Sequence, residues 1–420
     1  MTLKRNILAN YIGTGTVGLA PILALPWYLA ALGPKQFGLI GFIVMLQAVL
    51  GLLDMGMSQA LVREITVRLD SADGRRRTAT LLFGFERLYW LFALCAGCFT
   101  LLLADTIAKY WLNLEGLPVA LGREAIYGAA VIFAVQFPGS VYRSLLVGAQ
   151  AQVTLNGIML GGALLRHAGG VIVVLVWPTL LAYLIWHALI ALLETLVRGK
   201  VAWRILNVRR RQVCWEFSEL RPDWRLVAGM FGATMLGALT VQMDRIILSR
   251  MVNLEQFGYY TIAATVAVGS LQLINPLTQG ILPRAIQMRT DPVALRAISI
   301  KLLAAIALVV AASATAYLAA GEWLLNIWLR DPKPVAVVYP ILTIMLVGTA
   351  LNAFYNVGYM NWIARKNIRR VLQVNAFALI LSIVLIPWFV IWQGTIGAAI
   401  GWLAINLIGF LLSLEWLKQK

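Results

Sequence analysis

Long apolar runs dominate the chain, and polar residues recur mainly in short segments between them. Each run is long enough to cross a bilayer, because a transmembrane helix needs roughly 20 apolar residues. The pattern predicts twelve spans, over residues 9–32, 38–62, 79–104, 125–147, 155–177, 179–198, 226–249, 258–282, 298–321, 337–361, 371–392 and 395–416. The sequence therefore predicts an all-α polytopic membrane protein.

Composition and charge placement agree with this pattern. Apolar residues make up 61% of the chain and charged residues 13%, whereas about 25% of a soluble domain is charged. If the N-terminus is cytoplasmic, 25 Lys and Arg lie in inner segments and 6 in outer loops. That asymmetry follows the positive-inside rule and predicts that both termini are cytoplasmic. Much of the net charge of +17 then reflects topology, and we expect no nucleic-acid partner.

The second half of the chain also repeats a pattern of the first half. Gln36-Phe37-Gly38 aligns with Gln256-Phe257-Gly258, each in an outer loop that enters an inward-running span. The copies lie six spans apart, so they cross in the same direction and form a parallel repeat. We therefore expect an N-terminal six-helix bundle (1–198), a basic cytoplasmic linker (199–225) and a C-terminal six-helix bundle (226–420). A parallel pseudo-two-fold would relate the bundles around a central cavity.

Polar residues inside the predicted spans follow single helical faces. Span two carries Gln47, Gly51, Asp54 and Ser58, and span four carries Gln136, Ser140 and Arg143. Neutral polar groups could equally be interhelical hydrogen-bond partners, whereas a charge at mid-membrane costs at least ~2.5–3.5 kcal/mol and favours a watery cavity or an ion pair. The candidate cavity residues are Arg143, Arg166, Arg245, Gln136, Gln47, Asn10, Gln272 and Asn352, and the candidate ion-coupling residues are Asp54, Asp244 and Glu194.

Other motifs give little sign of further chemistry. Gly13-x-Gly15-x-x-Gly18 has the spacing of a dinucleotide fingerprint, but no strand is predicted before it, so close helix packing is favoured. The chain has no HExxH, Cys/His ligand cluster, Walker A or GxSxG motif. We expect no metal, no cofactor and no enzymatic activity. Energy would come from an ion gradient, the membrane potential or the substrate gradient. Glu86 and Arg87 are expected to reach the membrane interface, with a functional role as the less favoured alternative.

Three segments carry a family resemblance: "LALPWYLAALGPKQFGLIGFIVMLQAVLGLLDMGMSQALVREI", "QFPGSVYRSLLVGAQAQVTLN" and "LTVQMDRIILSRMVNLEQFGYYTIA". They resemble Wzx-type oligosaccharide (O-antigen) flippases of the multidrug/oligosaccharidyl-lipid/polysaccharide (MOP) exporter superfamily. The resemblance implies alternating-access translocation of undecaprenyl-pyrophosphate-linked repeat units across the bacterial inner membrane, for surface polysaccharides such as lipopolysaccharide. A polysaccharide polymerase and a chain-length regulator would be partners beside membrane lipids. The matching positions are Gly33, Phe37, Gly38, Asp54, Gly56, Arg63, Arg143, Gly148, Gln150, Asn156 and Asp244.

Physical chemistry agrees with this resemblance, because arginine offers a planar fork to a pyrophosphate. Aromatic side chains that could stack on sugar rings are Trp27, Tyr28, Trp90, Trp111, Trp177 and Trp186. A cation/drug antiporter of the same superfamily stays open, although it would favour an acidic cavity. A membrane-embedded polymerase or glycosyltransferase would favour larger outer loops than 105–124 and 322–336. A non-transporting scaffold leaves the mid-membrane charges unexplained.

Overall fold

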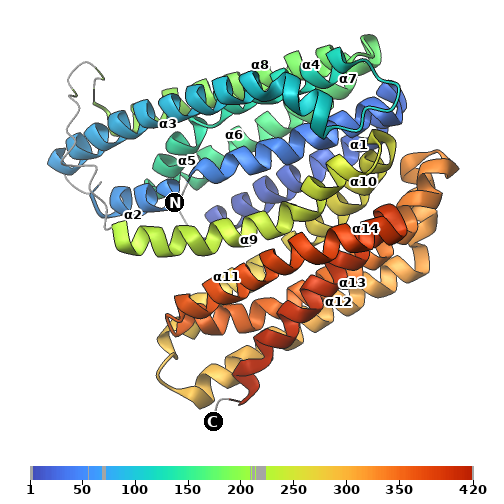
Figure 1. Ribbon diagram of the computed structural model, residues 1–420. Helices are drawn as coiled ribbons and strands as arrows, with labels where there is room; N and C mark the ends of the chain where they lie inside the picture. Colours follow the sequence, from blue (N-terminus) through green and yellow to red (C-terminus); the bar gives the residue numbers. More distant parts are fainter. Residues whose placement is uncertain are drawn as a thin grey trace. The chain divides into compact units, whose positions relative to one another are not determined.

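The protein is described by a computed structural model that covers residues 3–54, 56–68, 72–208, 210, 213 and 224–418. These residues form helices and turns and contain no strand (Figure 1). The helices are α1 (Leu3–Gly51), α2 (Met57–Arg68), α3 (Ala72–Thr106), α4 (Val119–Gln136), α5 (Gly139–Gly148), α6 (Gln152–Leu164), α7 (Gly170–Val176), α8 (Leu180–Leu206), α9 (Trp224–Met251), α10 (Leu254–Gly269), α11 (Asn275–Gln287), α12 (Pro292–Leu329), α13 (Pro332–Ala364) and α14 (Ile368–Ser413).

Nine helices within the described residues are long and apolar enough to cross a membrane. This confirms the all-α, multi-pass membrane fold, whereas the count of twelve spans stays a prediction. Two of the nine contain backbone breaks where the sequence analysis expects a turn between spans. In α1 Gly33 has φ 76°, and in α14 Gly394 has φ 57°. Glycine adopts this left-handed region without a Cβ penalty, so each break is encoded locally.

Helix starts follow from local sequence signals. Asp291 and Asp331 each precede a proline that begins α12 or α13. The Asp291 carboxylate accepts hydrogen bonds from the Val293 and Ala294 amides at 3.0 Å, and the Asp331 carboxylate accepts one from the Lys333 amide at 3.0 Å. An acidic N-cap followed by proline satisfies amides that would otherwise lack partners at the helix end.

The chain divides into two compact units, unit 1 over 1–231 and unit 2 over 232–420. In unit 1, α4 packs between α3 and α8, and α1 packs against α6 and α4. In unit 2, α13 is central and contacts α10, α12 and α14. The predicted boundary is not tested by this division. Residues 199–206 continue α8, and much of the expected linker (209, 211–212 and 214–223) lies outside the described residues.

Matching helix interruptions occur in the two units in the register of the repeat. A 3₁₀ turn, η1 (Leu52–Asp54), follows α1, and another, η6 (Ser270–Leu273), follows α10. The register that aligns Gly38 with Gly258 places η1 over 272–274, where it overlaps η6. The same register places the Gly33 break at Asn253, between α9 and α10. Spans two and eight are therefore each interrupted, rather than continuous as the sequence analysis expects.

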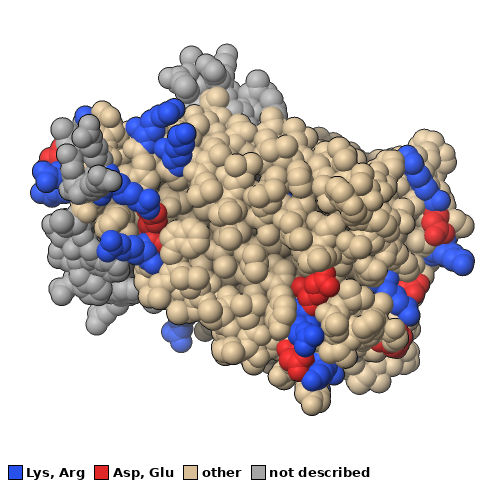
Figure 2. Space-filling model, turned by 90° about the horizontal axis from the view of Figure 1, so that it is seen from above, with Lys and Arg blue, Asp and Glu red and all other residues tan. Residues whose placement is uncertain are grey.

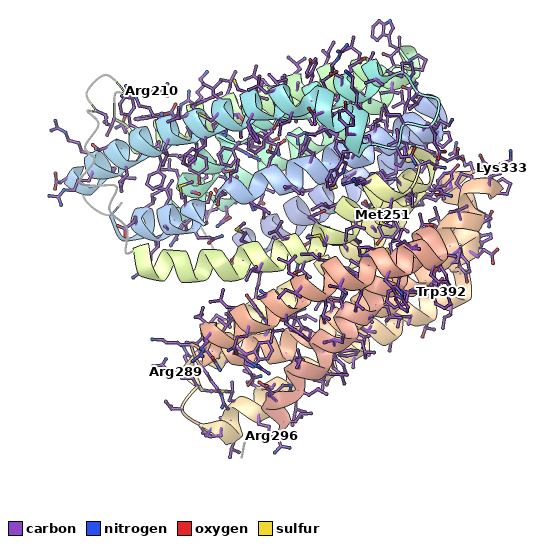
Figure 3. The ribbon with its side chains drawn as sticks, viewed as in Figure 1. Arg210, Met251, Arg289, Arg296, Lys333 and Trp392 are labelled. Atoms are coloured by element: carbon purple, nitrogen blue, oxygen red, sulfur yellow. The ribbon has the colours of Figure 1, made fainter. Side chains whose placement is uncertain are left out.

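Large apolar side chains are exposed along the outside of the helices. Leu102 is 81% exposed, Leu318 78% and Leu308 73%, which suits contact with lipid. On the face shown in Figure 2, charged side chains gather toward the edges and leave a wide area without charge. In unit 2, Arg289 and Arg296 lie at one end of the bundle and Lys333 at the other (Figure 3). In unit 2, charged residues therefore lie at both ends of the bundle, as in a membrane-spanning bundle (Figure 3).

The glycine motif near the N-terminus lies inside α1 and begins no helix after a strand. It therefore lacks the context of a dinucleotide site. A Cβ built on Gly15 would meet no atom of the described residues within 4 Å, so this glycine is not a point of close packing among them. Close packing occurs elsewhere: a Cβ on Gly148 would lie 2.7 Å from Ile65 Cγ2. Gly148 therefore allows α5 to approach α2.

Candidate functional site

Polar side chains from four helical segments of unit 1 gather around Glu194. Arg166 Nη2 donates to Glu194 Oε2 at 2.7 Å, and Arg198 forms an ion pair with Glu194 Oε1. The Arg166 and Glu194 side chains are 19% and 12% exposed, and that of Arg198 is 12% exposed. Arg166 Nη1 also donates to Gln136 Oε1 at 3.3 Å. We call Gln136, Arg143, Arg166, Glu194 and Arg198 the arginine cluster.

Local backbone geometry places Arg166 in the arginine cluster. The residue lies in η3 (Leu165–Gly169), a single π-helical turn between α6 and α7. A π turn is wider than an α turn and is frequent at functional sites. A Cβ on Gly162, one turn earlier, would lie 2.9 Å from Glu194 Cδ. Glycine at this position therefore allows the Glu194 carboxylate to approach the helix that carries Arg166.

The arginine cluster carries more positive than negative charge. Arg143, on α5, is exposed and forms no hydrogen bond or ion pair with the described residues, and it is close enough to Arg198 to repel it electrostatically. The Nε atoms of Arg166 and Arg198 are buried and lack a hydrogen-bond partner among the described residues. Arg166 and Arg198 thus share one carboxylate, and Arg143 adds a third positive charge near Arg198. Because the positive charges outnumber the negative one and two buried N–H groups lack acceptors, the arginine cluster favours the binding of an additional anion.

Arg198 is a member that the sequence analysis missed. It was treated as the end of span six, next to the cytoplasmic linker, but α8 continues past it to Leu206. Glu194 and Arg198 lie four residues apart, the spacing at which helical side chains of opposite charge meet. That spacing is the signal in the sequence that could have identified Arg198 as a partner of Glu194.

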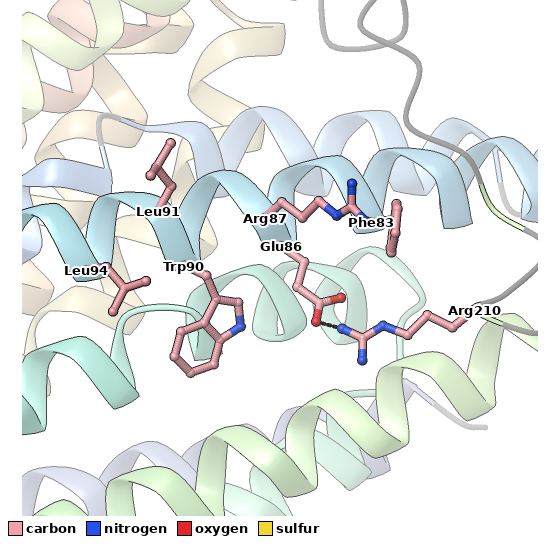
Figure 4. Close-up of a pocket in the computed structure, with 7 residues that line it drawn as sticks. All are labelled: Phe83, Glu86, Arg87, Trp90, Leu91, Leu94 and Arg210. Atoms are coloured by element: carbon pink, nitrogen blue, oxygen red, sulfur yellow. Dashed lines mark ion pairs between the residues drawn. The ribbon is translucent and has the colours of Figure 1, made fainter.

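Glu86 is buried, at 4% exposure, so its carboxylate is surrounded by protein groups. Its carboxylate accepts hydrogen bonds from the Tyr142 hydroxyl at 2.8 Å and from Trp203 Nε1 at 3.3 Å. It also forms an ion pair with Arg210 at the edge of a pocket of about 540 Å³ (Figure 4). These partners offset the cost of burying the charge. Glu86 therefore ties α3 to α5 and α8.

Asp54, in the polar stripe of span two, accepts two hydrogen bonds at one oxygen. The hydroxyls of Tyr89 and Ser58 both donate to Oδ1, the latter at 2.6 Å. The stripe is not one continuous helical face, because η1 and the left-handed Gly56 (φ 71°) interrupt it. The structure places Asp54 at this interruption, where it is bonded within unit 1.

Tyr28 is buried (2% exposed) rather than available for stacking on a sugar ring. Its ring lies edge-on to Tyr183 at 5.2 Å between centroids, and its hydroxyl donates to the His167 carbonyl oxygen at 3.2 Å. The Tyr183 and His187 rings stack at 3.9 Å. These side chains form an aromatic core beside the arginine cluster and hold η3 against α8.

In unit 2, Asp244 and Arg245 are both buried, at 2% and 8% exposure. The Asp244 carboxylate accepts hydrogen bonds from the Tyr260 hydroxyl at 2.5 Å and from the Arg245 amide at 2.7 Å. Arg245 Nη1 donates weakly to Gln242 at 3.5 Å, and its Nε has no partner among the described residues. Asp244 therefore has hydrogen-bond partners within its own unit.

The other predicted residues lie on elements outside the arginine cluster. Asn352 lies in a polar pocket of unit 2 and donates to Asn406 Oδ1 at 2.7 Å. Gln272 is exposed on η6 and accepts a 3.5 Å hydrogen bond from Asn275. Gln47 is half-buried on α1. The side chain of Asn10 lies outside the described residues. Within unit 1 the structure thus groups Gln136, Arg166 and Glu194, with Arg143 near Arg198, and the prediction of one shared cavity with the residues of unit 2 stays a prediction.

Comparison with known proteins shows to which family the chain belongs. The sequence pattern of the family described as "Polysaccharide biosynthesis protein" matches residues 31–331. The chain belongs to this family. It is also 22% identical over 430 residues to a Shigella flexneri protein named "Putative O-antigen transporter", covering 100% of this chain and 98% of that protein.

The fold is shared with solved membrane transporters. The structure of "Lipid II flippase MurJ" in an inward closed conformation matches with a TM-score of 0.76 at 14% identity, covering 99% of this chain and 87% of MurJ. A multidrug resistance MATE family transporter of the MOP superfamily matches with a TM-score of 0.75 at 13% identity, covering 95% and 93%.

The family match and the shared fold confirm the resemblance predicted from the sequence. The chain is a member of the polysaccharide-biosynthesis family with the fold of MOP-superfamily transporters, and this similarity agrees with the prediction of a transporter rather than an enzyme. The roles of individual site residues stay predictions.

Proposed function

We propose that the protein moves an undecaprenyl-pyrophosphate-linked oligosaccharide from the inner to the outer leaflet of the bacterial cytoplasmic membrane by alternating access. The observation that carries this proposal is the arginine cluster of unit 1. Two of its guanidinium groups share one carboxylate and the third, that of Arg143, lies near Arg198, in helices that are apolar enough to span a membrane. The names of the Shigella relative and of MurJ support a lipid-linked substrate.

The substrate's pyrophosphate supplies the negative charge and the hydrogen-bond acceptors that the arginine cluster lacks. Each guanidinium can donate two parallel hydrogen bonds to phosphate oxygens, and charge-assisted bonds of this kind are roughly twice as strong as neutral ones. Arg143 offers its whole fork, because it is exposed and bonds to none of the described residues. Gln136 adds a neutral amide beside the charges. We infer that Arg143 makes the first contact with the pyrophosphate and that Arg166 and Arg198 complete its coordination.

The acidic candidates give less support to a cation/drug antiporter. Asp54 is bonded to Tyr89 and Ser58, Asp244 to Tyr260, and Glu194 to two arginines. An antiporter would present a carboxylate to its cationic substrate. A drug cation would therefore have to displace an existing partner at each acid, whereas an anion meets unpaired arginine nitrogens. A polymerase and a chain-length regulator of surface polysaccharide are proposed as partners.

Arg143 variants test the proposed function. Arg143→Gln removes the charge, and binding of undecaprenyl pyrophosphate should weaken roughly 10- to 100-fold, as expected for loss of charge-assisted hydrogen bonds. Arg143→Lys keeps the charge without the fork and should retain intermediate binding. Arg296→Gln changes an exposed arginine at the end of unit 2 and serves as the matched control.

Two measurements check these expectations: binding to the purified protein in nanodiscs, and appearance of lipid-linked sugar in the outer leaflet of cells that carry each variant at equal abundance. Arg143→Gln should fail in both and Arg296→Gln in neither. If Arg143→Gln binds and exports as well as the wild type, the arginine cluster is not the pyrophosphate site.

A further inference from the structure

A polar pocket of about 380 Å³ lies within unit 2, between α9, α13 and α14. Four asparagines and two tyrosines supply most of its polar groups. We call this site the asparagine pocket. Its polar lining consists mainly of Asn352, Tyr355, Asn356, Tyr359, Asn375 and Asn406. None of the described residues that line it is charged. Amides in a membrane-spanning bundle are costly unless they find partners, so this concentration needs an explanation.

Helix packing accounts for part of the asparagine pocket. Asn352 Nδ2 donates to Asn406 Oδ1 at 2.7 Å and joins α13 to α14. Asn406 Nδ2 in turn donates to the Trp402 carbonyl oxygen at 2.8 Å. The Tyr355 hydroxyl lies 3.5 Å from Asn375 Oδ1, to which it donates weakly. The Asn352–Asn406 and Tyr355–Asn375 bonds join α13 to α14 and hold these walls of the pocket together, whereas the Asn406–Trp402 bond lies within α14.

Two polar groups in the pocket are not explained by helix packing. Asn356 Nδ2 donates only to the Asn352 carbonyl oxygen of its own helix, at 2.9 Å, so its Oδ1 has no hydrogen bond from the described residues. The Tyr359 hydroxyl likewise bonds to none of them. Both side chains are half-buried and line the pocket. The pocket therefore offers an amide oxygen and a phenol hydroxyl to a ligand.

The chemistry of the lining selects a class of ligand. A pyrophosphate needs cations, which the lining does not provide, and a lipid tail would leave the amides without partners. A neutral sugar has hydroxyls that both donate and accept, which amide and phenol groups match. The Tyr355 and Tyr359 rings, with centroids 6.0 Å apart, add apolar surface for the C–H faces of a sugar ring. The volume lies within the roughly 300–1,000 Å³ of small-molecule sites.

We propose that the asparagine pocket binds a neutral sugar residue of the transported oligosaccharide. This proposal rests on the proposed function and adds to it that the pyrophosphate and the glycan bind at two separate sites. The arginine cluster of unit 1 takes the pyrophosphate, whereas the asparagine pocket of unit 2 takes part of the glycan. Asn356 and Tyr359 are the residues that contact the sugar.

The double variant Asn356→Ala/Tyr359→Phe tests the asparagine pocket. It removes no bond between helices, so the protein should fold and unfold as the wild type does. The matched control is Asn326→Ala, because Asn326 is exposed on α12 and also donates to a carbonyl of its own helix, that of Glu322, at 2.9 Å. Binding is measured on full-length protein in nanodiscs with two probes. These are undecaprenyl pyrophosphate and the lipid-linked oligosaccharide extracted from cells that produce this protein.

The double variant should bind the lipid-linked oligosaccharide about tenfold more weakly, as expected for the loss of one or two hydrogen bonds. Its affinity for undecaprenyl pyrophosphate should not change, and the control should bind both probes as the wild type does. Equal loss for both probes, or no loss for either, would overturn the sugar assignment. If the wild type binds the sugar-free lipid only, the glycan pocket is wrong and the pyrophosphate assignment stands. If it binds neither probe, the proposed function fails as well.

Discussion

At the scale of single residues, Glu194 is the resident anion of the arginine cluster. Its two oxygens hold Arg166 and Arg198 where a pyrophosphate would need them. Because all three side chains are largely buried, these ion pairs are poorly screened by water. The carboxylate keeps the guanidinium groups oriented in the absence of substrate. Binding of a pyrophosphate would then compete with Glu194 for the same hydrogen-bond donors.

Glu194→Gln should therefore destabilise the protein. Removing one partner of a buried ion pair typically costs about 3–5 kcal/mol, because the remaining charges stay buried. The apparent unfolding temperature of the purified protein in detergent should fall, and added pyrophosphate should restore part of the loss by replacing the missing anion. Asp105→Asn is the control, since Asp105 pairs with Lys109 and Arg123 at an exposed site. An unfolding temperature for Glu194→Gln equal to that of the control would refute this role.

At the scale of elements, the breaks within long helices decide how the chain runs. The region Ile368–Leu417 contains 50 residues, which as one straight helix would extend roughly 75 Å, more than twice the hydrocarbon thickness. The chain instead turns at Gln393 and Gly394, and Gly397 packs against the preceding segment. A Cβ on Gly397 would lie 1.9 Å from the Phe389 carbonyl oxygen. Glycine is thus required where α14 folds back.

Gly397→Ala should disrupt this turn. Overpacking typically costs about 1–3 kcal/mol, and here the obstacle is backbone that cannot rotate away. The abundance of folded protein in the membrane should fall several-fold, as measured by fluorescence-detected size-exclusion chromatography. Gly157→Ala on α6 is the matched control, because a Cβ there meets no atom within 4 Å. If both variants fold equally well, the turn does not depend on Gly397.

At the scale of the whole molecule, the breaks in α1 and α14 and the uneven distribution of Lys and Arg together predict one membrane topology. If α1 and α14 each cross the membrane twice, Lys35 and Gly394 should face outward, while the C-terminus faces the cytoplasm. Reporter domains inserted after Lys35 and Gly394 should be active only outside the cytoplasm, and a reporter fused after Lys420 only inside. A cytoplasmic signal at either break would show that the helix crosses once, and the parallel repeat would then be wrong.

Much of the fold could be predicted from the sequence, because the bilayer imposes a simple physical rule. Unsatisfied backbone groups are too costly in lipid, so long apolar runs must be helices. The same reasoning explains why Arg143, Arg166 and Glu194 could be singled out, since charges inside apolar runs need a compensating environment. The repeat between the two halves was also visible, because Gln36-Phe37-Gly38 and Gln256-Phe257-Gly258 stand at matching positions.

Only the tertiary structure decided which of these polar residues lie together. Glu194 contacts Arg166 because η3 packs against α8, a relation that no spacing along the chain encodes. Glu86 is buried because Tyr142, Trp203 and Arg210 surround it. The sequence predicts Asn352 only as one of several cavity residues, and the structure shows which neighbours it has: the other asparagines and the tyrosines of an uncharged pocket in unit 2. Hydropathy specifies which segments enter the membrane, but the partners of a buried polar group depend on packing between helices that are distant in sequence.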